Sequence, residues 1–194
     1  AFVLMMNLCG CKKGSYDVYE EIYERYYKMK AFSAIAEVTV VNERTENSYE
    51  IKQSYLAPDC FSLEVLKPEK IAGSGFVSSE GETFFKSGFG HGERIKNSFA
   101  DKRGCLFVSD FFEDYFKSEE TAVMVDSSKG ESVTVLECFL NSGEKKKFLQ
   151  KIWIDNETFL PVRFETFDVN NQPQVVVVFT EFNRDCDIDE SEFE

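Results

Sequence analysis

The sequence predicts an α+β fold in which a strongly curved antiparallel sheet, an incomplete β-barrel, has helices against its concave face. A helical apolar period near the N-terminus gives way to long stretches of strand-like alternation separated by turn-like breaks. One short helical pattern interrupts these stretches. The 194 residues suit one domain with a sizeable core, and 20 phenylalanines within 43% hydrophobic content exclude a disordered chain.

The first expected element is a helix over residues 15–30. Asp17 and Glu20 have the spacing of a capping box, which satisfies backbone N–H groups at a helix start. Apolar and aromatic residues recur at three- and four-residue steps, at Tyr16, Tyr19, Ile22, Tyr23, Tyr26 and Met29. Such a stripe either forms a binding surface or packs the helix on a sheet, and packing is its commoner use.

Strands are expected on both sides of a second, short helix over residues 109–117. Before this helix, alternating residues predict a meander with one face on a core. The alternating runs are 32–40, 49–55 and 61–65, followed by a hairpin that joins Phe76-Val77 to Phe84-Phe85. After the helix, strands are expected over 122–125, 133–140, 148–154, 162–167 and 175–182.

The apolar, β-branched run at residues 175–179 allows two interpretations. A central position in the sheet would make it ordinary core. A position at the edge would invite strand pairing or swapping between copies, and hence a homodimer. The core interpretation is favoured.

The N-terminal residues resemble the end of a bacterial lipoprotein signal peptide. Residues 1–10 carry no charge, and Leu8-Cys9-Gly10-Cys11 has the aliphatic, small and cysteine positions of a lipobox. We expect residues 1–10 to be a signal-peptide remnant, Cys11 the lipidated residue and 11–14 a tether, so that the protein is exported and anchored to the outer face of a membrane. The alternative is a short apolar strand with incidental cysteines.

The rest of the chain divides into one domain over residues 15–183 and an acidic tail over 184–194, which is expected to be solvated. The net charge of −13 opposes binding to nucleic acid. A single histidine excludes a multi-histidine metal site, and Gly-x-Ser-x-Gly is absent. Cys60, Cys105, Cys138 and Cys186 form no Cys-x-x-Cys pair, which leaves a disulfide or free buried thiols open. Composition therefore indicates a binding protein without metal or cofactor.

Three segments carry a resemblance to a known family. They are residues 49–65, residues 81–85, and Trp153-Ile154-Asp155 with the following Thr158, Leu160-Pro161-Val162-Arg163 and Asp168. Over residues 15–182 the chain resembles the superfamily of LolA/LolB outer-membrane lipoprotein carriers, and within it the GerS group of clostridial spore-germination lipoproteins. The superfamily implies an incomplete barrel whose interior can hold acyl chains. We expect Phe61, Leu63, Phe76, Phe84 and Trp153 to line such a cavity or fill the core.

The spore-germination resemblance implies a non-enzymatic, membrane-anchored lipoprotein of the spore envelope. It implies binding and activation of a zinc-dependent cell-wall amidase, an N-acetylmuramoyl-L-alanine amidase, for muramic-δ-lactam formation in cortex peptidoglycan. Zinc is then expected on the partner only. The alternative is a lipid or lipoprotein carrier with an apolar cavity. The sequence does not indicate which surface meets a partner.

Overall fold

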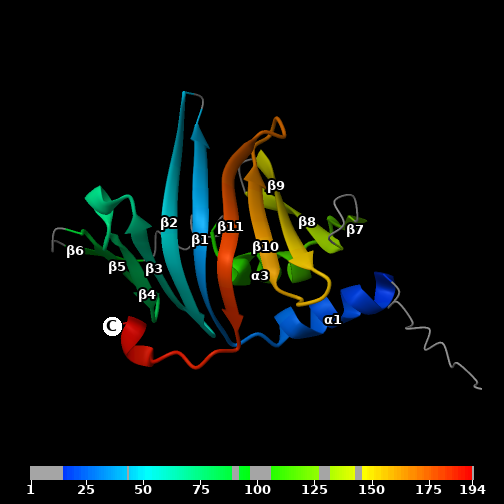
Figure 1. Ribbon diagram of the computed structural model, residues 1–194, viewed down its shortest axis with the longest axis horizontal. Helices are drawn as coiled ribbons and strands as arrows, with labels where there is room; N and C mark the ends of the chain where they lie inside the picture. Colours follow the sequence, from blue (N-terminus) through cyan, green and yellow to red (C-terminus); the bar gives the residue numbers. More distant parts are fainter. Residues whose placement is uncertain are drawn as a thin grey trace, which may run out of the picture.

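The computed structural model describes residues 15–42, 44–88, 92–96, 106–126, 132–142 and 146–193 (Figure 1). The helices are α1 (Ser15–Tyr27) and α3 (Val108–Lys117), with short 3-10 turns η1 (Glu69–Ile71) and η2 (Glu190–Phe193). The strands are β1 (Ala31–Asn42), β2 (Thr45–Leu56), β3 (Cys60–Lys67), β4 (Gly75–Ser79), β5 (Glu82–Lys86), β6 (Gly92–Lys96), β7 (Thr121–Asp126), β8 (Val133–Ser142), β9 (Lys146–Asp155), β10 (Pro161–Phe167) and β11 (Pro173–Arg184).

Within the described residues the strands form one 11-stranded antiparallel sheet in the order β6-β5-β4-β3-β2-β1-β11-β10-β9-β8-β7. Two meanders are joined where β1 pairs with β11, and the sheet is open, with β6 and β7 at its edges. The run at residues 175–179 lies in β11 and is hydrogen-bonded to β1 on one side and β10 on the other. The core interpretation of this run is therefore correct. Both edges of β11 are paired within the chain, so this strand does not offer the free edge on which the homodimer interpretation depended.

Helix α3 lies behind the central strands in Figure 1 and packs against the concave face of the sheet. The ring centroid of Phe107, which precedes the helix, lies 5.1 Å from Phe61 in β3 and 6.0 Å from Phe76 in β4. The ring of Phe111 lies 5.7 Å from Phe164 in β10. The helix thus bridges both meanders, as expected for a curved sheet with helices on its inner face.

Helix α1 splits the predicted aromatic stripe between two faces. Ile22 and Tyr26 are buried, and the Tyr26 ring stacks on Phe112 of α3 with centroids 4.0 Å apart. Tyr23 and Tyr27 are exposed and stack on each other. The helix ends at Tyr27 rather than at residue 30, because the chain must turn there into β1. No helix in the described part of the chain has the length and apolar character that crossing a membrane requires.

The acidic C-terminal segment is packed against the sheet, which corrects the expectation of a solvated tail. Phe193 in η2 is buried, and η2 contacts β3 and β4. The Ser54 hydroxyl donates to a Glu192 carboxylate oxygen at 3.2 Å, and Lys52 lies 3.7 Å from the same oxygen. Ser54 and Lys52 alternate with the inward-facing Gln53, so the segment covers the outer face of β2. One apolar residue within an acidic run anchors the whole segment.

Candidate partner-binding surface

Three of the residues expected inside the sheet are in the hydrophobic core. Phe61, Leu63 and Phe76 are buried and belong to the cluster that packs around α3. They come from neighbouring strands, with Leu63 directly opposite Phe76 in the β3–β4 ladder. They contact other side chains of the core there.

Phe84 lies on the opposite face from the one expected. Thr83 is buried and donates to the Ser78 hydroxyl at 3.1 Å, while the Phe85 ring lies 5.9 Å from Phe76. Side chains alternate along a strand, so Phe84 points outward and is 39% exposed. Its ring covers Gly92 of β6, where an added Cβ would stand 2.1 Å from the Phe84 Cζ. The inward residue of the Phe84-Phe85 pair is Phe85.

Trp153 is likewise on the outer face of the sheet and half-buried. Its neighbours Ile152 and Ile154 have no exposed surface and belong to the core cluster. The alternation of β9 therefore turns the indole away from the concave side. The expectation that Trp153 lines a cavity is wrong for this reason.

Aromatic side chains fill the concave side of the sheet that the structure describes. These side chains are at most 2% exposed, and they are Phe32, Phe107, Phe111, Phe112 and Phe164. The buried Gln53 amide donates from Nε2 to the Leu106 carbonyl at 3.0 Å, which ties the start of α3 to β2. In this conformation α3 and these aromatic side chains occupy the concave side of the sheet.

The outer face carries a continuous row of side chains across neighbouring strands, which we call the outer row. Residues that stand directly opposite one another in successive ladders share a face of the sheet. The outer row runs across β7, β8, β9, β10, β11 and β1 and consists of Met124, Val135, Trp153, Arg163, Val178 and Glu37. Met124 and Val178 are exposed, whereas Val135 is buried beneath its neighbours. This row was not identified from the sequence, although Ile-Trp-Ile at 152–154 carries the alternation that would have located the tryptophan.

Ion pairs hold the polar side chains of this face in place. The Arg163 guanidinium lies 5.7 Å from the Trp153 ring centroid and pairs with the largely buried Glu165 carboxylate. Lys151 pairs with Glu137 and lies 5.5 Å from the Phe167 ring centroid. Two contacts therefore fix Arg163 over the indole. The Arg163 side chain then loses less conformational entropy when a partner binds.

The outer row becomes acidic toward β1 and β2. Glu37 in β1 stands opposite Val178 on one side and Glu50 on the other. Glu50 pairs with Lys67 at 2.9 Å, and this hydrogen bond raises the pKa of Lys67. Glu37 is exposed and places a negative charge beside the apolar residues, within electrostatic reach of Lys67.

A hollow of about 660 Å³ lies between the tips of the β1–β2 and β10–β11 hairpins. Arg44, Thr45, Asp168 and Gln172 are among its lining residues. The Asp168 carboxylate accepts the backbone N–H groups of Gln172 and Asn170 at 2.8 Å each, and these bonds lower its pKa. Asp168 therefore holds its own turn, and the hollow gathers no set of groups that suggests a ligand.

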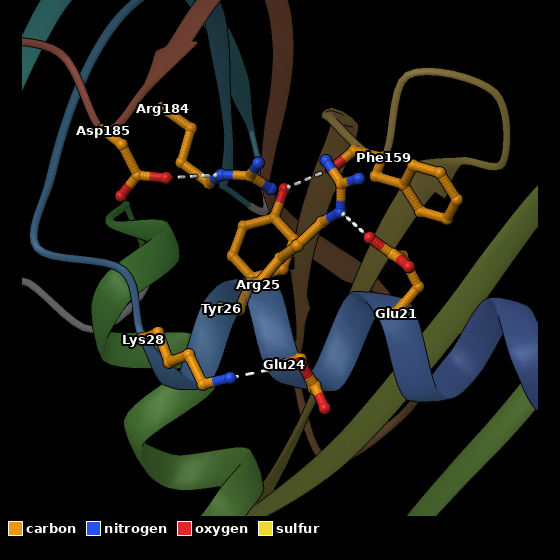
Figure 2. A network of polar contacts seen from close by, with 8 residues as sticks. All are labelled: Glu21, Glu24, Arg25, Tyr26, Lys28, Phe159, Arg184 and Asp185. Carbon is orange, nitrogen blue, oxygen red and sulfur yellow. Dashed lines mark hydrogen bonds and ion pairs between the residues drawn. The ribbon is translucent and has the colours of Figure 1, made fainter.

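A buried tyrosine joins α1 to two distant segments (Figure 2). The Tyr26 hydroxyl donates to the Phe159 carbonyl at 3.0 Å, and the Arg184 guanidinium lies 5.8 Å from the Tyr26 ring centroid. Arg184 also donates to Asp185 at 2.9 Å, and Arg25 lies over the Phe159 ring. Burial raises the pKa of Tyr26. These contacts fix α1 against the β9–β10 turn and the end of β11, so the cluster has a structural role.

The described residues contain no group of three or more His, Cys, Asp or Glu side chains that could hold a metal ion. Cys60, Cys138 and Cys186 are free thiols. Burial raises the pKa of Cys138, which disfavours a reactive thiolate. The lipidation candidate Cys11, the signal and tether segments 1–14, His91 and Cys105 lie outside the described residues.

Comparisons with solved structures find the same fold in other proteins. The GerS lipoprotein of Clostridioides difficile, solved in complex with the CwlD amidase, is 26% identical, with a TM-score of 0.51 over 89% of this chain and 96% of that chain. An uncharacterised conserved protein from Thermus thermophilus is 14% identical, with a TM-score of 0.58 over 90% of this chain and 91% of the other. A LolA superfamily protein from Nitrosomonas europaea is 10% identical, with a TM-score of 0.48 over 94% of this chain and 98% of the other.

No curated protein matches the chain. A family model does, and it covers residues 1–193, which include the whole sheet, both packed helices and the C-terminal segment. The chain therefore belongs to the family of YdcC-like sporulation proteins.

Proposed function

We propose that this chain is a non-enzymatic lipoprotein that binds and activates a zinc-dependent cell-wall amidase during spore formation. The observation that carries the proposal is the similarity to GerS, which was solved in complex with an amidase, within a chain that belongs to a sporulation family. The amidase would act on N-acetylmuramoyl-L-alanine bonds of cortex peptidoglycan, a step toward muramic-δ-lactam. Zinc would be held by the amidase, and this chain would stabilise its active conformation.

The packing of the concave side supports a role in protein binding. The inner face of the sheet is occupied by α3 and by the buried face of α1. Binding then falls to the outer surface, where exposed apolar and charged side chains are available. A protein partner uses such a surface without any change in the core.

We further propose that the chain is exported and anchored through Cys11 to the outer face of a bacterial membrane in the spore envelope. Cys11 lies four residues before Ser15, where α1 begins. A tether of this length spans at most about 14 Å, so the domain would stay close to the lipid surface. Mass spectrometry of the membrane-extracted protein would detect a diacylglyceryl group on Cys11, and an unmodified thiol there would refute the anchor.

An activity assay with two purified components tests the main proposal. The cell-wall amidase encoded by the same genome is incubated with peptidoglycan, with and without this chain, and the released stem peptides are measured. We expect a stable complex in a pull-down and faster cleavage when the chain is present. A mixture that forms no complex and cleaves at the rate of the amidase alone would refute the proposal. Cleavage by this chain alone would refute its non-enzymatic role.

A lipid or lipoprotein carrier is the second candidate, because an open curved sheet with helices on its concave face is the architecture that the LolA-like resemblance implies. The aromatic side chains around α3 count against it in this conformation. Mass spectrometry of the protein purified from membranes would reveal stoichiometric acyl lipid if the protein is a carrier. Purification free of lipid would leave the amidase-binding proposal in place.

A further inference from the structure

In the described residues, other elements pack on some parts of the sheet and leave other parts uncovered. α3 and α1 pack on its concave side, and the C-terminal segment with η2 lies over β2, β3 and β4 on the outer side. In Figure 1 no helix passes in front of β9, β10 and β11. We propose that the outer row, centred on Trp153 and Arg163, is the surface on which the amidase docks, an inference that rests on the proposed function.

The chemistry of the outer row fits a protein partner. Tryptophan and arginine are enriched among residues that dominate binding energy, and methionine is enriched in interfaces. Trp153 and Arg163 are adjacent in the β9–β10 ladder, and the cation–π contact between them holds both side chains in one arrangement. Met124 and Val178 extend the apolar surface on either side. The strands β8, β9, β10, β11 and β1 beneath the row are each paired on both sides, so little backbone order is lost when a partner binds.

The charge pattern specifies what the partner presents. The apolar part of the outer row ends at Glu37, and the chain as a whole carries a net charge of −13. Arg163 is already paired with Glu165, so it adds little free positive charge to the surface. The matching surface of the amidase therefore has an apolar patch opposite Trp153 and Val178 and basic side chains opposite Glu37. Association is then accelerated by long-range attraction that salt weakens.

Substitutions on the two faces of β7 test the surface with matched exposure. Met124 in the outer row is 47% exposed, and the adjacent Val123 is 42% exposed and points toward the concave side, opposite Leu136. Affinity of the full chain for the purified amidase is measured by calorimetry for wild type, Met124→Lys and Val123→Lys. Val178→Lys, on the other side of Trp153 and Arg163 from Met124, is compared with Val169→Lys on the exposed β10–β11 turn. Circular dichroism melting establishes that each variant is folded.

We expect Met124→Lys and Val178→Lys to weaken amidase binding at least tenfold, with Val123→Lys and Val169→Lys within twofold of wild type. Raising the salt concentration from 50 to 500 mM should slow association with the wild-type chain. Unchanged affinity of both outer-row variants, with wild type still binding, would overturn the docking surface and leave the proposed function intact. Equal losses of affinity for Met124→Lys and Val123→Lys would place the partner along the free edge of β7. That result would also overturn the outer row as the docking surface. No binding by the wild-type chain would refute the proposed function itself.

Discussion

Removal of the Phe111 ring tests whether α3 is an integral part of the core. Phe111 has no exposed surface, and its ring centroid lies 5.3 Å from Phe112, 5.7 Å from Tyr115 and 5.7 Å from Phe164. These neighbours belong to α3 itself and to β10, which holds its position by pairing on both sides. The surroundings therefore have little freedom to collapse into the space that Phe111→Ala leaves.

The size of the effect follows from that geometry. A buried phenylalanine replaced by alanine costs about 3–5 kcal/mol when the cavity stays open. In a domain of this length each kcal/mol lowers the melting temperature by roughly 2–4 °C, so the expected decrease is about 6–20 °C. Urea unfolding followed by circular dichroism gives the free energy of unfolding directly. Phe139→Ala on β8 is the control, because Phe139 is exposed and should cost less than about 1 kcal/mol.

A loss below about 1 kcal/mol for Phe111→Ala would refute the reasoning. It would mean that α3 contributes little to the core and that the concave side is available to a ligand. The carrier function would then become the better interpretation of the fold. A large loss would instead identify α3 as a permanent filling of the concave side.

The remaining predictions concern the contacts that fix α1, the C-terminal segment and the β3–β4 ladder. Tyr26→Phe should cost about 1–2 kcal/mol in urea unfolding, because the Phe159 carbonyl loses its donor. Burial raises the pKa of Tyr26, so the unfolded chain loses the hydroxyl proton at a lower pH than the folded chain does. The stability of the wild-type chain should therefore fall as the pH rises above about 10, and the variant should lack this part of the fall. Phe193→Ala should lower the free energy of unfolding by about 2–4 kcal/mol and expose η2 to proteolysis. The control Val169→Ala, on an exposed turn, should change the free energy of unfolding by less than about 0.5 kcal/mol. Equal effects of the two substitutions would show that the C-terminal segment is not docked on the sheet. Gly75→Ala should cost more than about 1 kcal/mol, because an added Cβ would stand 1.9 Å from the Leu63 carbonyl oxygen in the paired strand, and unchanged melting would contradict this close approach.

Local patterns were sufficient to predict the elements but not the direction of every side chain. The period of 3.6 residues located α1 and α3, and alternation located the strands of both meanders except β6, which was not expected from the sequence. Phe84-Phe85 offers two equivalent aromatic residues on opposite faces, and only the pairing of Phe85 with Phe76 decides which one enters the core. The expected inward position of Trp153 is wrong, because its two isoleucine neighbours occupy the inward positions of β9.

The long-range contacts could not be predicted from local sequence. Phe193 is one aromatic residue in an acidic run, and its burial depends on a surface of β3 and β4 that is more than 100 residues away in the chain. The outer row likewise arises from registers between strands, because Trp153 and Arg163 become neighbours only when β9 and β10 pair with a bulge at residue 162. Register depends on the whole sheet, so the candidate binding surface required the structure.

The occupied concave side sets an energetic condition on the carrier function. To admit a ligand, α3 would have to withdraw Phe107, Phe111 and Phe112 from the core. Exposing three phenylalanine side chains of about 150–250 Å² each costs roughly 11–19 kcal/mol at about 25 cal/mol per Å². That cost is comparable to or larger than the whole stability of a typical domain, which is about 5–15 kcal/mol. Burial of an acyl chain of ~16 carbons would contribute about 13 kcal/mol at ~0.8 kcal/mol per CH₂. The replacement of the three phenylalanine side chains by lipid would therefore be near balance only if the lipid restored every lost contact. A partner that docks on the outer row requires no such exchange, which is the physical reason to prefer protein binding for this chain.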